Sequence, residues 1–138
     1  MESTLVLIKP DAFGKGYTGE ILKRYEAQGL KIQAMKLLKM TPELAEKHYA
    51  EHVGKGFYPE LVEFMTSAPL VALVLAGEGA IAKVRALNGA TNPEKAEPGT
   101  IRADFAESMS FNAVHASDSL ENANREISIF FNQAEIFA

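Results

Sequence analysis

The sequence of 138 residues is 47% hydrophobic, which is enough apolar surface for the core of a single domain over residues 1–138. The charged fraction of 23% and the even spread of apolar residues exclude a disordered or low-complexity chain. Cysteine is absent, so a disulfide framework, a thiolate metal site and a cysteine nucleophile are excluded, as suits a reducing cytoplasm. A net charge of −4 argues against a broad nucleic-acid surface but not against a small anionic ligand.

No segment resembles a targeting or membrane-spanning sequence. Residues 69–76 form the longest apolar stretch, which is less than half of the roughly 20 residues that cross a bilayer. The apolar run 5–8 is stopped by Lys9 and Pro10, well short of a signal-peptide core. We therefore expect a cytoplasmic protein without a membrane partner.

A strand and a helix are the first elements expected along the chain. The apolar run 3–8 ends before Pro10, which cannot donate a hydrogen bond into a sheet, so a buried strand is expected there. Apolar residues over 18–28 have helical spacing, which predicts a helix with Thr18 as its N-cap and Gly29 at its C-terminal end.

A second strand and a pair of helices follow. Alternation over 30–38 predicts a half-buried strand, and a phase shift towards residues 37–38 indicates a β-bulge. Residues 41–43 supply an N-cap, a first-turn proline and a first-turn acid, which predicts a helix to about His52. A further helix is expected over 59–67, and the two form a helical pair.

Strands and helices also alternate in the second half, around one long loop. The continuous apolar run 70–76 is typical of a strand covered by helices, and a helix is expected over 79–87. Residues 88–100 contain several glycines and prolines, and an ordered loop of this length is usually functional. A last strand is expected near 111–115.

The chain ends in a predicted amphipathic helix. Asp118 followed by Glu121 matches a capping box. The apolar side of this helix consists of Leu120, Ala123, Ile127, Phe130 and Phe131. The alternation of strands and helices is typical of an α/β or α+β sandwich, and the continuous apolar run 70–76 favours a parallel sheet.

Two nucleotide-binding motifs are incomplete in this sequence. Residues 77–82 fit the glycine pattern of a dinucleotide fingerprint, but the acidic residue expected about 20 positions on, Glu97, lies in a proline-rich loop. A tight strand-to-helix turn is therefore favoured for 77–82. Residues 14–19 have the glycine spacing of a Walker A loop but continue to Glu20 instead of a Lys-Ser or Lys-Thr pair.

Three histidines offer a zinc alternative. His48 and His52 lie four residues apart on a predicted helix, and His115 is a candidate third ligand. The zincin motif needs glutamate where Tyr49 stands, so a packing or surface role is favoured for the helical pair of histidines.

His115 also has a polar setting that favours an anion. It lies in the segment 112–119, directly before the final helix, whose free N–H groups attract anions. Glu126 shares a helical face with Asp118 and can therefore orient the imidazole. These features predict an anion site with a candidate histidine nucleophile and with candidate cations on separate elements: Lys9, Arg85 and Arg102.

Five segments together resemble one known family. They are Ile8-Lys9-Pro10-Asp11-Ala12, Phe64-Met65-Thr66-Ser67, Gly89-Ala90-Thr91-Asn92-Pro93, Pro98-Gly99-Thr100-Ile101-Arg102-Ala103-Asp104-Phe105 and His115-Ala116-Ser117-Asp118-Ser119. In this order and at these spacings they closely resemble nucleoside diphosphate kinases. The resemblance covers essentially the whole chain.

This resemblance implies a fold and a reaction. The fold is an α+β, ferredoxin-like βαββαβ sandwich, whose four-stranded antiparallel sheet carries an added helical pair. The reaction is Mg²⁺-dependent transfer of the γ-phosphate of a nucleoside triphosphate, such as ATP or GTP, to a nucleoside diphosphate through a phosphohistidine at His115. The metal is expected mainly on nucleotide phosphates and water, and the protein is expected to be a homo-oligomer.

The resemblance also implies roles for individual residues. The catalytic set is His115, Lys9, Tyr49, Glu126 and Ser117, in which Ser117 and Glu126 surround the nucleophile and Tyr49 lies beside the phosphate. The nucleotide-binding set is Lys9, Phe57, Arg85, Thr91, Arg102 and Asn112. Its cations and Thr91 face the phosphates, Phe57 stacks on the base, and Asn112 with Lys9 reaches the sugar.

Two positions depart from the family pattern. Ala116 stands where glycine usually follows the nucleophile, and Gly56 stands where proline usually precedes the stacking Phe57. A glycine after His115 can use torsions that alanine disfavours. Two other functions stay open: a nucleotide-binding regulatory module that does not turn over, and a zinc hydrolase.

Overall fold

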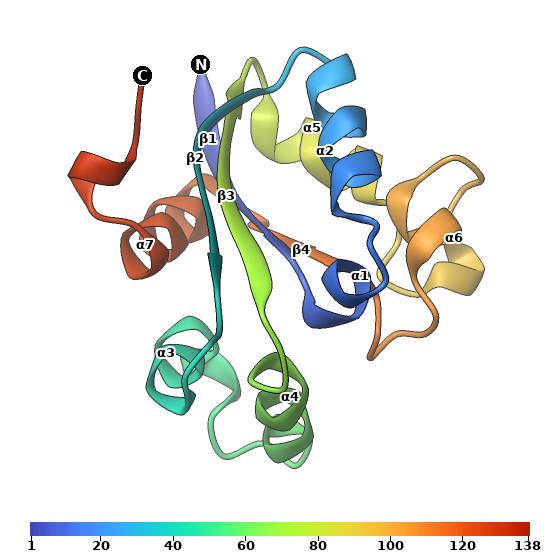
Figure 1. The fold of residues 1–138 in the computed structure, drawn as a ribbon, viewed down its shortest axis with the longest axis vertical. Helices are drawn as coiled ribbons and strands as arrows, with labels where there is room; N and C mark the ends of the chain where they lie inside the picture. Colours follow the sequence, from blue (N-terminus) through green and yellow to red (C-terminus); the bar gives the residue numbers. More distant parts are fainter.

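The sheet has four antiparallel strands in the order β2-β3-β1-β4. The computed structural model describes all residues from 1 to 138 (Figure 1). The strands are β1 (Glu2–Ile8), β2 (Lys31–Leu38), β3 (Leu70–Gly77) and β4 (Val114–Ala116). The central strand β1 pairs with both β3 and β4. This arrangement confirms the α+β sandwich with an antiparallel sheet, so the parallel sheet that the run 70–76 favoured is wrong.

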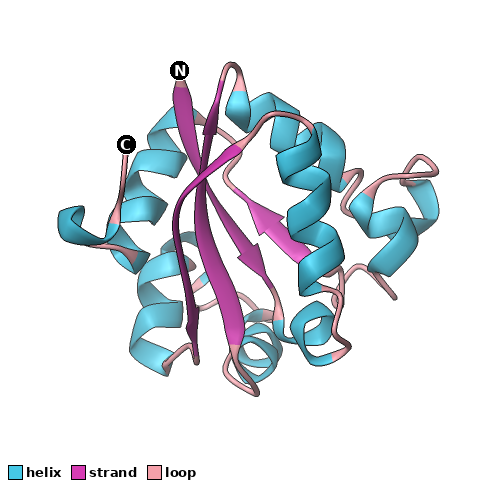
Figure 2. Ribbon diagram, turned by 45° about the horizontal axis from the view of Figure 1, so that its top comes forward, coloured by secondary structure: helices cyan, strands magenta, loops and turns pink.

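Helices cover both faces of the sheet, as Figure 2 shows. They are α1 (Pro10–Gly14), α2 (Thr18–Ala27), α3 (Pro42–His48), α4 (Tyr58–Met65), α5 (Ala80–Asn88), α6 (Ile101–Phe105) and α7 (Leu120–Phe130). The helical pair α3 and α4 lies at one end of the sheet (Figure 1), joined through the 3₁₀ turn Ala50–His52. None of the helices is both long and apolar enough to cross a membrane.

The two faces of the sheet are buried by different helices. Val6 and Ile8 of β1 belong to a core cluster with residues of α2 and α5, whereas Leu5 and Leu7 belong to a second cluster with residues of α3, α4 and α7. Side chains alternate along a strand, so a strand covered on both faces needs apolar residues at every position. Double coverage therefore explains why the antiparallel strand β3 has the sequence pattern of a parallel one.

Two helix boundaries differ from the prediction. α3 ends at His48 rather than near His52, because the chain tightens there into the 3₁₀ turn Ala50–His52. Thr18 is the first residue of α2 instead of its N-cap, which is Tyr17. α1 and α6 were not predicted, since helices of five residues are too short to show a periodic apolar pattern.

The start of α7 departs from the predicted capping box. Ser119, rather than Asp118, is the N-cap, and its hydroxyl accepts a hydrogen bond from the Asn122 N–H at 3.1 Å. Asp118 instead accepts a hydrogen bond from the Asn122 side-chain amide at 2.7 Å. Leu120 was expected on the apolar side of the helix, but it is exposed.

β4 is shorter than predicted and begins later than residue 111. Ala113 has φ +72° and is the only non-glycine residue with a positive φ. The Val114 N–H donates to the Asn112 carbonyl at 2.8 Å, which closes a tight three-residue turn. An extended strand cannot run through this turn, so sheet pairing starts at Val114. A bulge is present in β2 as predicted, but it lies between Ile32 and Ala34, earlier than the shift towards residues 37–38 indicated.

Residues 77–82 form a strand-to-helix turn, as the sequence indicates. Gly79 is the N-cap of α5 and has φ +58°, a conformation that glycine adopts without strain. The Ile81 N–H at the start of α5 donates to the Glu2 carboxylate at 3.2 Å. A carboxylate of the chain therefore contacts the helix end at which a dinucleotide phosphate would bind.

Candidate active site

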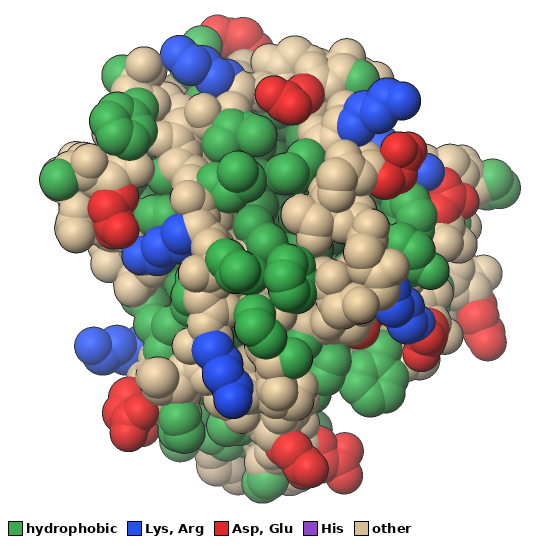
Figure 3. All heavy atoms as spheres, viewed as in Figure 1, with side chains coloured by type: hydrophobic (Ala, Val, Ile, Leu, Met, Phe, Trp, Pro, Cys, Tyr) green, Lys and Arg blue, Asp and Glu red, His purple; other side chains and the backbone are tan.

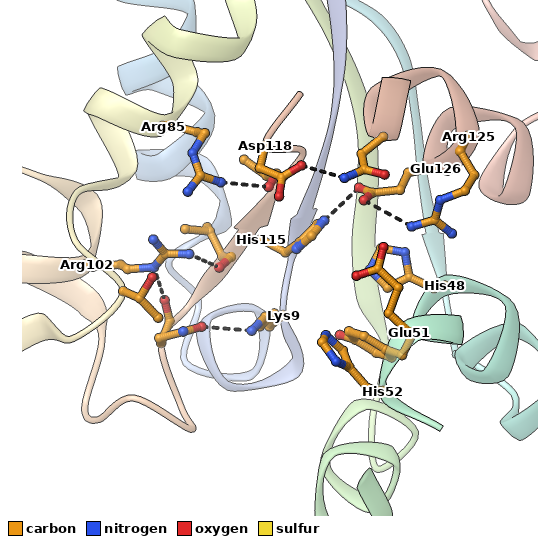
Figure 4. Close-up of a pocket in the computed structure, with 16 residues that line it drawn as sticks. Lys9, His48, Glu51, His52, Arg85, Arg102, His115, Asp118, Arg125 and Glu126 are labelled. Carbon is orange, nitrogen blue, oxygen red and sulfur yellow. Dashed lines mark hydrogen bonds and ion pairs between the residues drawn. The ribbon is translucent and has the colours of Figure 1, made fainter. Parts of the chain in front are cut away.

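A polar cavity of about 270 Å³ opens where β1, β4 and α7 meet the helical pair and α5 (Figure 4). Eight of the residues predicted from the sequence line it: Lys9, Tyr49, Arg85, Thr91, Arg102, Asn112, His115 and Glu126. Ser117 contacts this group through Glu126. Phe57 lies in an adjoining cavity. The structure thus brings together residues that are far apart in the sequence.

His115 lies in the middle of β4, half-buried, opposite Leu7 of the central strand. Its Nε2 atom is 2.8 Å from Oε1 of Glu126, and the two side chains point toward one another in Figure 4. The Ser117 hydroxyl donates to the same carboxylate oxygen at 2.9 Å. Nη2 of Arg125 lies 3.7 Å from the other oxygen. Glu126 is buried, so these contacts fix the carboxylate and, through it, the imidazole.

A second imidazole packs beside the first. The rings of His48 and His115 are 4.8 Å apart and meet edge to face at 84°. Burial, together with the nearby His115, lowers the pKa of His48 to about 2, so His48 is neutral. Candidate ligand atoms of His48, His115 and Glu126 lie within 4.8 Å of one another, but His52 is not part of this group. The zinc set of three histidines that the sequence left as an alternative is therefore not assembled.

Lys9 directly follows β1, at the N-cap of α1, and lines the cavity. Its ammonium group donates to Oδ1 of Asn112 at 2.8 Å. Burial, with a smaller contribution from the Arg102 charge, lowers the pKa of Lys9 to about 8, while Asp11 acts in the opposite direction. Lys9 is therefore a cation near pH 7 that loses its charge more readily than a surface lysine.

The two arginines are held by backbone carbonyl groups. The Arg102 guanidinium donates to three of them, on Asn112 at 3.3 Å, Gly89 at 2.9 Å and Val114 at 2.8 Å. An arginine has five N–H donors, so two remain for a ligand. Burial lowers the pKa of Arg102. Arg85 makes one such bond, to the Ala116 carbonyl at 3.4 Å.

An aromatic cavity of about 610 Å³ adjoins the polar one. Its apolar wall consists of Phe57, Leu61, Phe64, Met109 and Phe111. The two cavities share a boundary that both sets of lining residues include: Lys9, Tyr49, His52, Thr91 and His115. Burial raises the pKa of Tyr49 well above its usual range, so this phenol keeps its proton. One elongated ligand can thus extend from the cations to the aromatic rings.

The sequence did not single out several residues that complete the site. His48 was considered only as a zinc ligand, and Arg125 beside Glu126 carried no signal. Asp11 accepts a hydrogen bond from the Ala113 N–H at 3.0 Å, which secures the tight turn before β4. The His48–His115 and Asp11–Ala113 contacts join residues far apart in the chain, so no local sequence pattern indicates them. Arg125 directly precedes Glu126 on α7, and an arginine on a helix is too common to indicate a site.

The departures from the family pattern do not distort the backbone. Ala116 is not among the residues with positive φ, so alanine adopts its conformation there without penalty. Gly56 also lacks a positive φ, and a Cβ atom added to it would meet nothing within 4 Å. The site therefore does not require glycine at either position.

Comparisons with known proteins agree with this geometry. The family model for nucleoside diphosphate kinase matches residues 2–136. The nucleoside diphosphate kinase of Campylobacter fetus is 57% identical over 136 residues, which cover 99% of each chain. The solved structure of the Aquifex aeolicus nucleoside diphosphate kinase has a TM-score of 0.95 at 47% identity and covers 98% of both chains. A halophilic nucleoside diphosphate kinase from Halobacterium salinarum, solved in complex with CDP, has a TM-score of 0.96 at 42% identity, covering 99% of this chain and 91% of its own.

The fold and these similarities define an enzyme of the phosphotransferase class, a kinase of nucleotide metabolism. The chain belongs to the nucleoside diphosphate kinase family.

Proposed function

We propose that the chain transfers the γ-phosphate of a nucleoside triphosphate to a nucleoside diphosphate through a phosphohistidine at His115. The observation that carries this proposal is the contact of 2.8 Å between His115 Nε2 and Glu126 Oε1. A carboxylate only accepts hydrogen bonds, so Nε2 holds the proton and Nδ1 keeps a lone pair. The Ser117 hydroxyl donates to the same carboxylate oxygen, and the Arg125 guanidinium lies near the other one, so both help to hold the carboxylate in place.

The reaction has two halves that use one site in turn. In the first half, the Nδ1 lone pair of His115 forms a bond to the γ-phosphorus, the bond from that phosphorus to the bridging oxygen breaks, and a nucleoside diphosphate leaves. In the second half, a terminal oxygen of another nucleoside diphosphate attacks the phosphorus, and Nδ1 regains its lone pair. Because the same residues serve both halves, one nucleotide site is sufficient.

The cations of the polar cavity offset the charge of the transferring group. Lys9, Arg85 and Arg102 come from three different elements and line the same cavity. Arg102 and Lys9 are held by hydrogen bonds within the protein, so little reorganisation is needed when a phosphate binds. The Thr91 hydroxyl and the protonated Tyr49 phenol are neutral donors at the same place.

The nucleoside part occupies the aromatic cavity in this proposal. Phe57 is half-exposed there and presents its ring for stacking, which tolerates any base because every base has a π-face. Lys9, which lines both cavities, and its hydrogen-bond partner Asn112 in the polar cavity reach the sugar hydroxyls. The CDP complex of the Halobacterium salinarum enzyme supports a nucleoside diphosphate as ligand. We expect adenine, guanine, cytosine and uracil nucleotides to be accepted within about tenfold.

Mg²⁺ is the cofactor that we propose for this phosphoryl transfer. Besides Glu126, which contacts His115, the polar cavity offers the carboxylates of Glu51 and Asp118 but no cage of oxygen ligands, which suits a cation bound mainly by phosphates and water. Hydrogen bonding from Asn122 lowers the pKa of Asp118, so this carboxylate is charged and able to attract such a hydrated cation. When bound, the metal neutralises charge on the phosphates.

We also propose a cytoplasmic homo-oligomer. The edge strand β2 carries two exposed apolar side chains, Met35 and Leu37. Figure 3 shows apolar side chains gathered in the middle of this face, over β2 and β3, with charged side chains around them. An exposed apolar patch on a sheet edge is a typical contact surface between subunits.

Two measurements test the proposed reaction. The protein is incubated with Mg²⁺ and γ-labelled ATP and then freed of nucleotide; the label should stay on the protein in an acid-labile, alkali-stable bond, as expected of a phosphoramidate. Initial-rate plots for both substrates should give parallel lines. Intersecting lines with no labelled protein would indicate direct transfer in a ternary complex and would refute the proposal.

A further inference from the structure

Phe111 organises the loop that faces the nucleotide cavity. Its carbonyl accepts hydrogen bonds from the backbone N–H groups of Glu107 at 2.9 Å and Ser108 at 3.3 Å. Its own N–H donates to the Ser108 hydroxyl at 3.1 Å. These three bonds close residues 107–111 into a tight loop, so the position of the Phe111 ring is set by the backbone as well as by its contacts.

The Phe111 ring lies against the helical pair across the aromatic cavity. It meets Phe64 of α4 edge to face, with ring centroids 4.8 Å apart and planes at 80°. The other exposed ring of this cavity, Phe57, contacts His52 at 5.3 Å and makes no contact with Phe111. The two rings thus stand on separate parts of the wall of one cavity.

Phe111 keeps 43% of its surface exposed although it is anchored at the backbone and on one edge. An anchored aromatic side chain that still presents its surface to a cavity loses little conformational freedom when a ligand covers it. The phosphates are held at the far end, by Lys9 and His115, so the base of a bound nucleotide extends towards this wall.

We propose that Phe111 is a specificity-determining residue that favours purine over pyrimidine nucleotides. The inference rests on the proposed function, because it needs a nucleotide whose phosphates lie in the polar cavity. A one-ring base covers Phe57, whereas a two-ring base extends further and also covers the Phe111 ring. Stacking is sequence-tolerant but grows with the aromatic area in contact, so the preference is graded rather than absolute.

Equilibrium binding of diphosphates tests this assignment. GDP, ADP, CDP and UDP are titrated calorimetrically into the unphosphorylated protein, where no phosphate is transferred because no triphosphate is present. The native chain should bind the two purine nucleotides about five times more tightly than the two pyrimidine nucleotides. In Phe111→Ala the purine affinities should fall about fivefold and the pyrimidine affinities less than twofold, which removes the preference.

Two variants separate base contact from loop structure. Ser108→Ala removes the hydroxyl that accepts the hydrogen bond from the Phe111 N–H but keeps the Phe111 ring. Any loss of affinity in this variant should therefore be equal for all four nucleotides. Phe111→Tyr keeps the ring and should retain the purine preference. Thermal unfolding of each variant shows whether the fold persists. An equal loss for all bases in Phe111→Ala, or no loss, would overturn the assignment.

This test is independent of phosphohistidine chemistry. If labelled ATP failed to label the protein while Phe111→Ala still removed the purine preference, the proposed transfer mechanism would fail and the role of Phe111 would stand. If the protein were labelled normally while Phe111→Ala changed the affinity for all four nucleotides equally, the proposed transfer mechanism would stand and the role of Phe111 would fail.

Discussion

The polar and aromatic cavities meet at His115, yet they are built in opposite ways. In the polar cavity Lys9, Asn112 and Glu126 are buried, and each is held by a hydrogen bond within the protein. In the aromatic cavity Phe57 and Met109 are 51% and 59% exposed and make no side-chain hydrogen bond. Groups that act on developing charge gain from being fixed in advance, because no reorganisation is then needed. Groups that stack on a base gain from exposed surface that adapts to its shape.

The two cavities also differ in the elements that carry them. The polar groups stand on β4, α6 and α7 and on Lys9, directly after β1, and the pairing of β4 with β1 limits their movement. The aromatic groups stand on α4, its preceding residue Phe57, and the loop 106–113, at one end of the sheet (Figure 1). We therefore expect substitutions in the polar cavity to lower the rate of transfer, and substitutions in the aromatic cavity to raise KM.

The largest effect is expected at the nucleophile. His115→Ala removes the atom that forms the bond to phosphorus and leaves Lys9, Arg102 and Phe57 in place. Turnover should fall by at least about 10,000-fold, while nucleotide affinity changes less than about threefold. Steady-state assays and calorimetric binding on the same preparation measure both. Substantial transfer in a contaminant-free preparation would exclude His115 as nucleophile, and an equal loss of affinity would make it a binding residue.

A smaller effect on the rate is expected at Glu126, which contacts His115 and not the phosphate. Glu126→Ala frees the imidazole from the carboxylate at 2.8 Å, so the tautomer and ring orientation are no longer fixed. The first-order rate of histidine phosphorylation should fall about 10- to 100-fold with little change in KM. Rapid-quench experiments with labelled ATP separate the two quantities. Ser117→Ala keeps the carboxylate and serves as the matched control, with a loss below that of Glu126→Ala.

The charge of Lys9 makes nucleotide binding depend on pH. Burial and Arg102 lower its pKa to about 8, so the fraction of charged lysine falls as the pH rises through this value. A bound phosphate stabilises the charged form; affinity is therefore full below the pKa and is lost above it. Between pH 7 and 9 the affinity for a nucleoside diphosphate should fall about tenfold. Lys9→Met should bind weakly at both pH values, and a slope identical to that of the native chain would assign the effect to another group.

In the aromatic cavity, the expected effect falls on KM. Phe57→Ala removes the stacking ring, whose loss should raise KM about tenfold for all bases and leave kcat within about twofold. Phe57→Tyr is the control that keeps the ring. A fall in kcat as large as the rise in KM would show that the two cavities are coupled. The assignment of rate effects to the polar cavity and KM effects to the aromatic cavity would then be wrong.

Sequence and structure agree best where a local pattern is enough. The strand 3–8 and the helix 18–28 follow from apolar spacing, and the structure places both within a few residues. Local patterns mislead where tertiary contacts decide. β3 is apolar throughout because helices cover both faces, and the same pattern occurs in parallel sheets. β4 starts late because a turn at Ala113 interrupts it.

The candidate site divides in the same way. The polar segment around His115 and the helix after it indicate an anion site by themselves, but convergence of Lys9 and Arg102 does not follow from spacing. The family resemblance implied a shared site for Lys9 and Arg102, because the residues of a family motif occupy the same positions in a common fold. Neither the local sequence pattern nor the family resemblance indicated a role for Phe111. Three hydrogen bonds close the loop 107–111 and thereby place its ring at the cavity.

The smallest expected effect concerns Ala116, the departure next to the nucleophile. Because its φ is not positive, glycine offers no relief there and only adds freedom to the unfolded chain. Ala116→Gly should therefore lower the free energy of unfolding by about 0.5–1 kcal/mol and leave kcat within about twofold. Ala113→Gly is the matched comparison, since φ +72° at Ala113 is a conformation that glycine adopts more readily. Urea unfolding should show a smaller loss for Ala113→Gly, or a gain; a gain in stability or a fivefold rise in kcat for Ala116→Gly instead would mean that alanine strains the strand that carries His115.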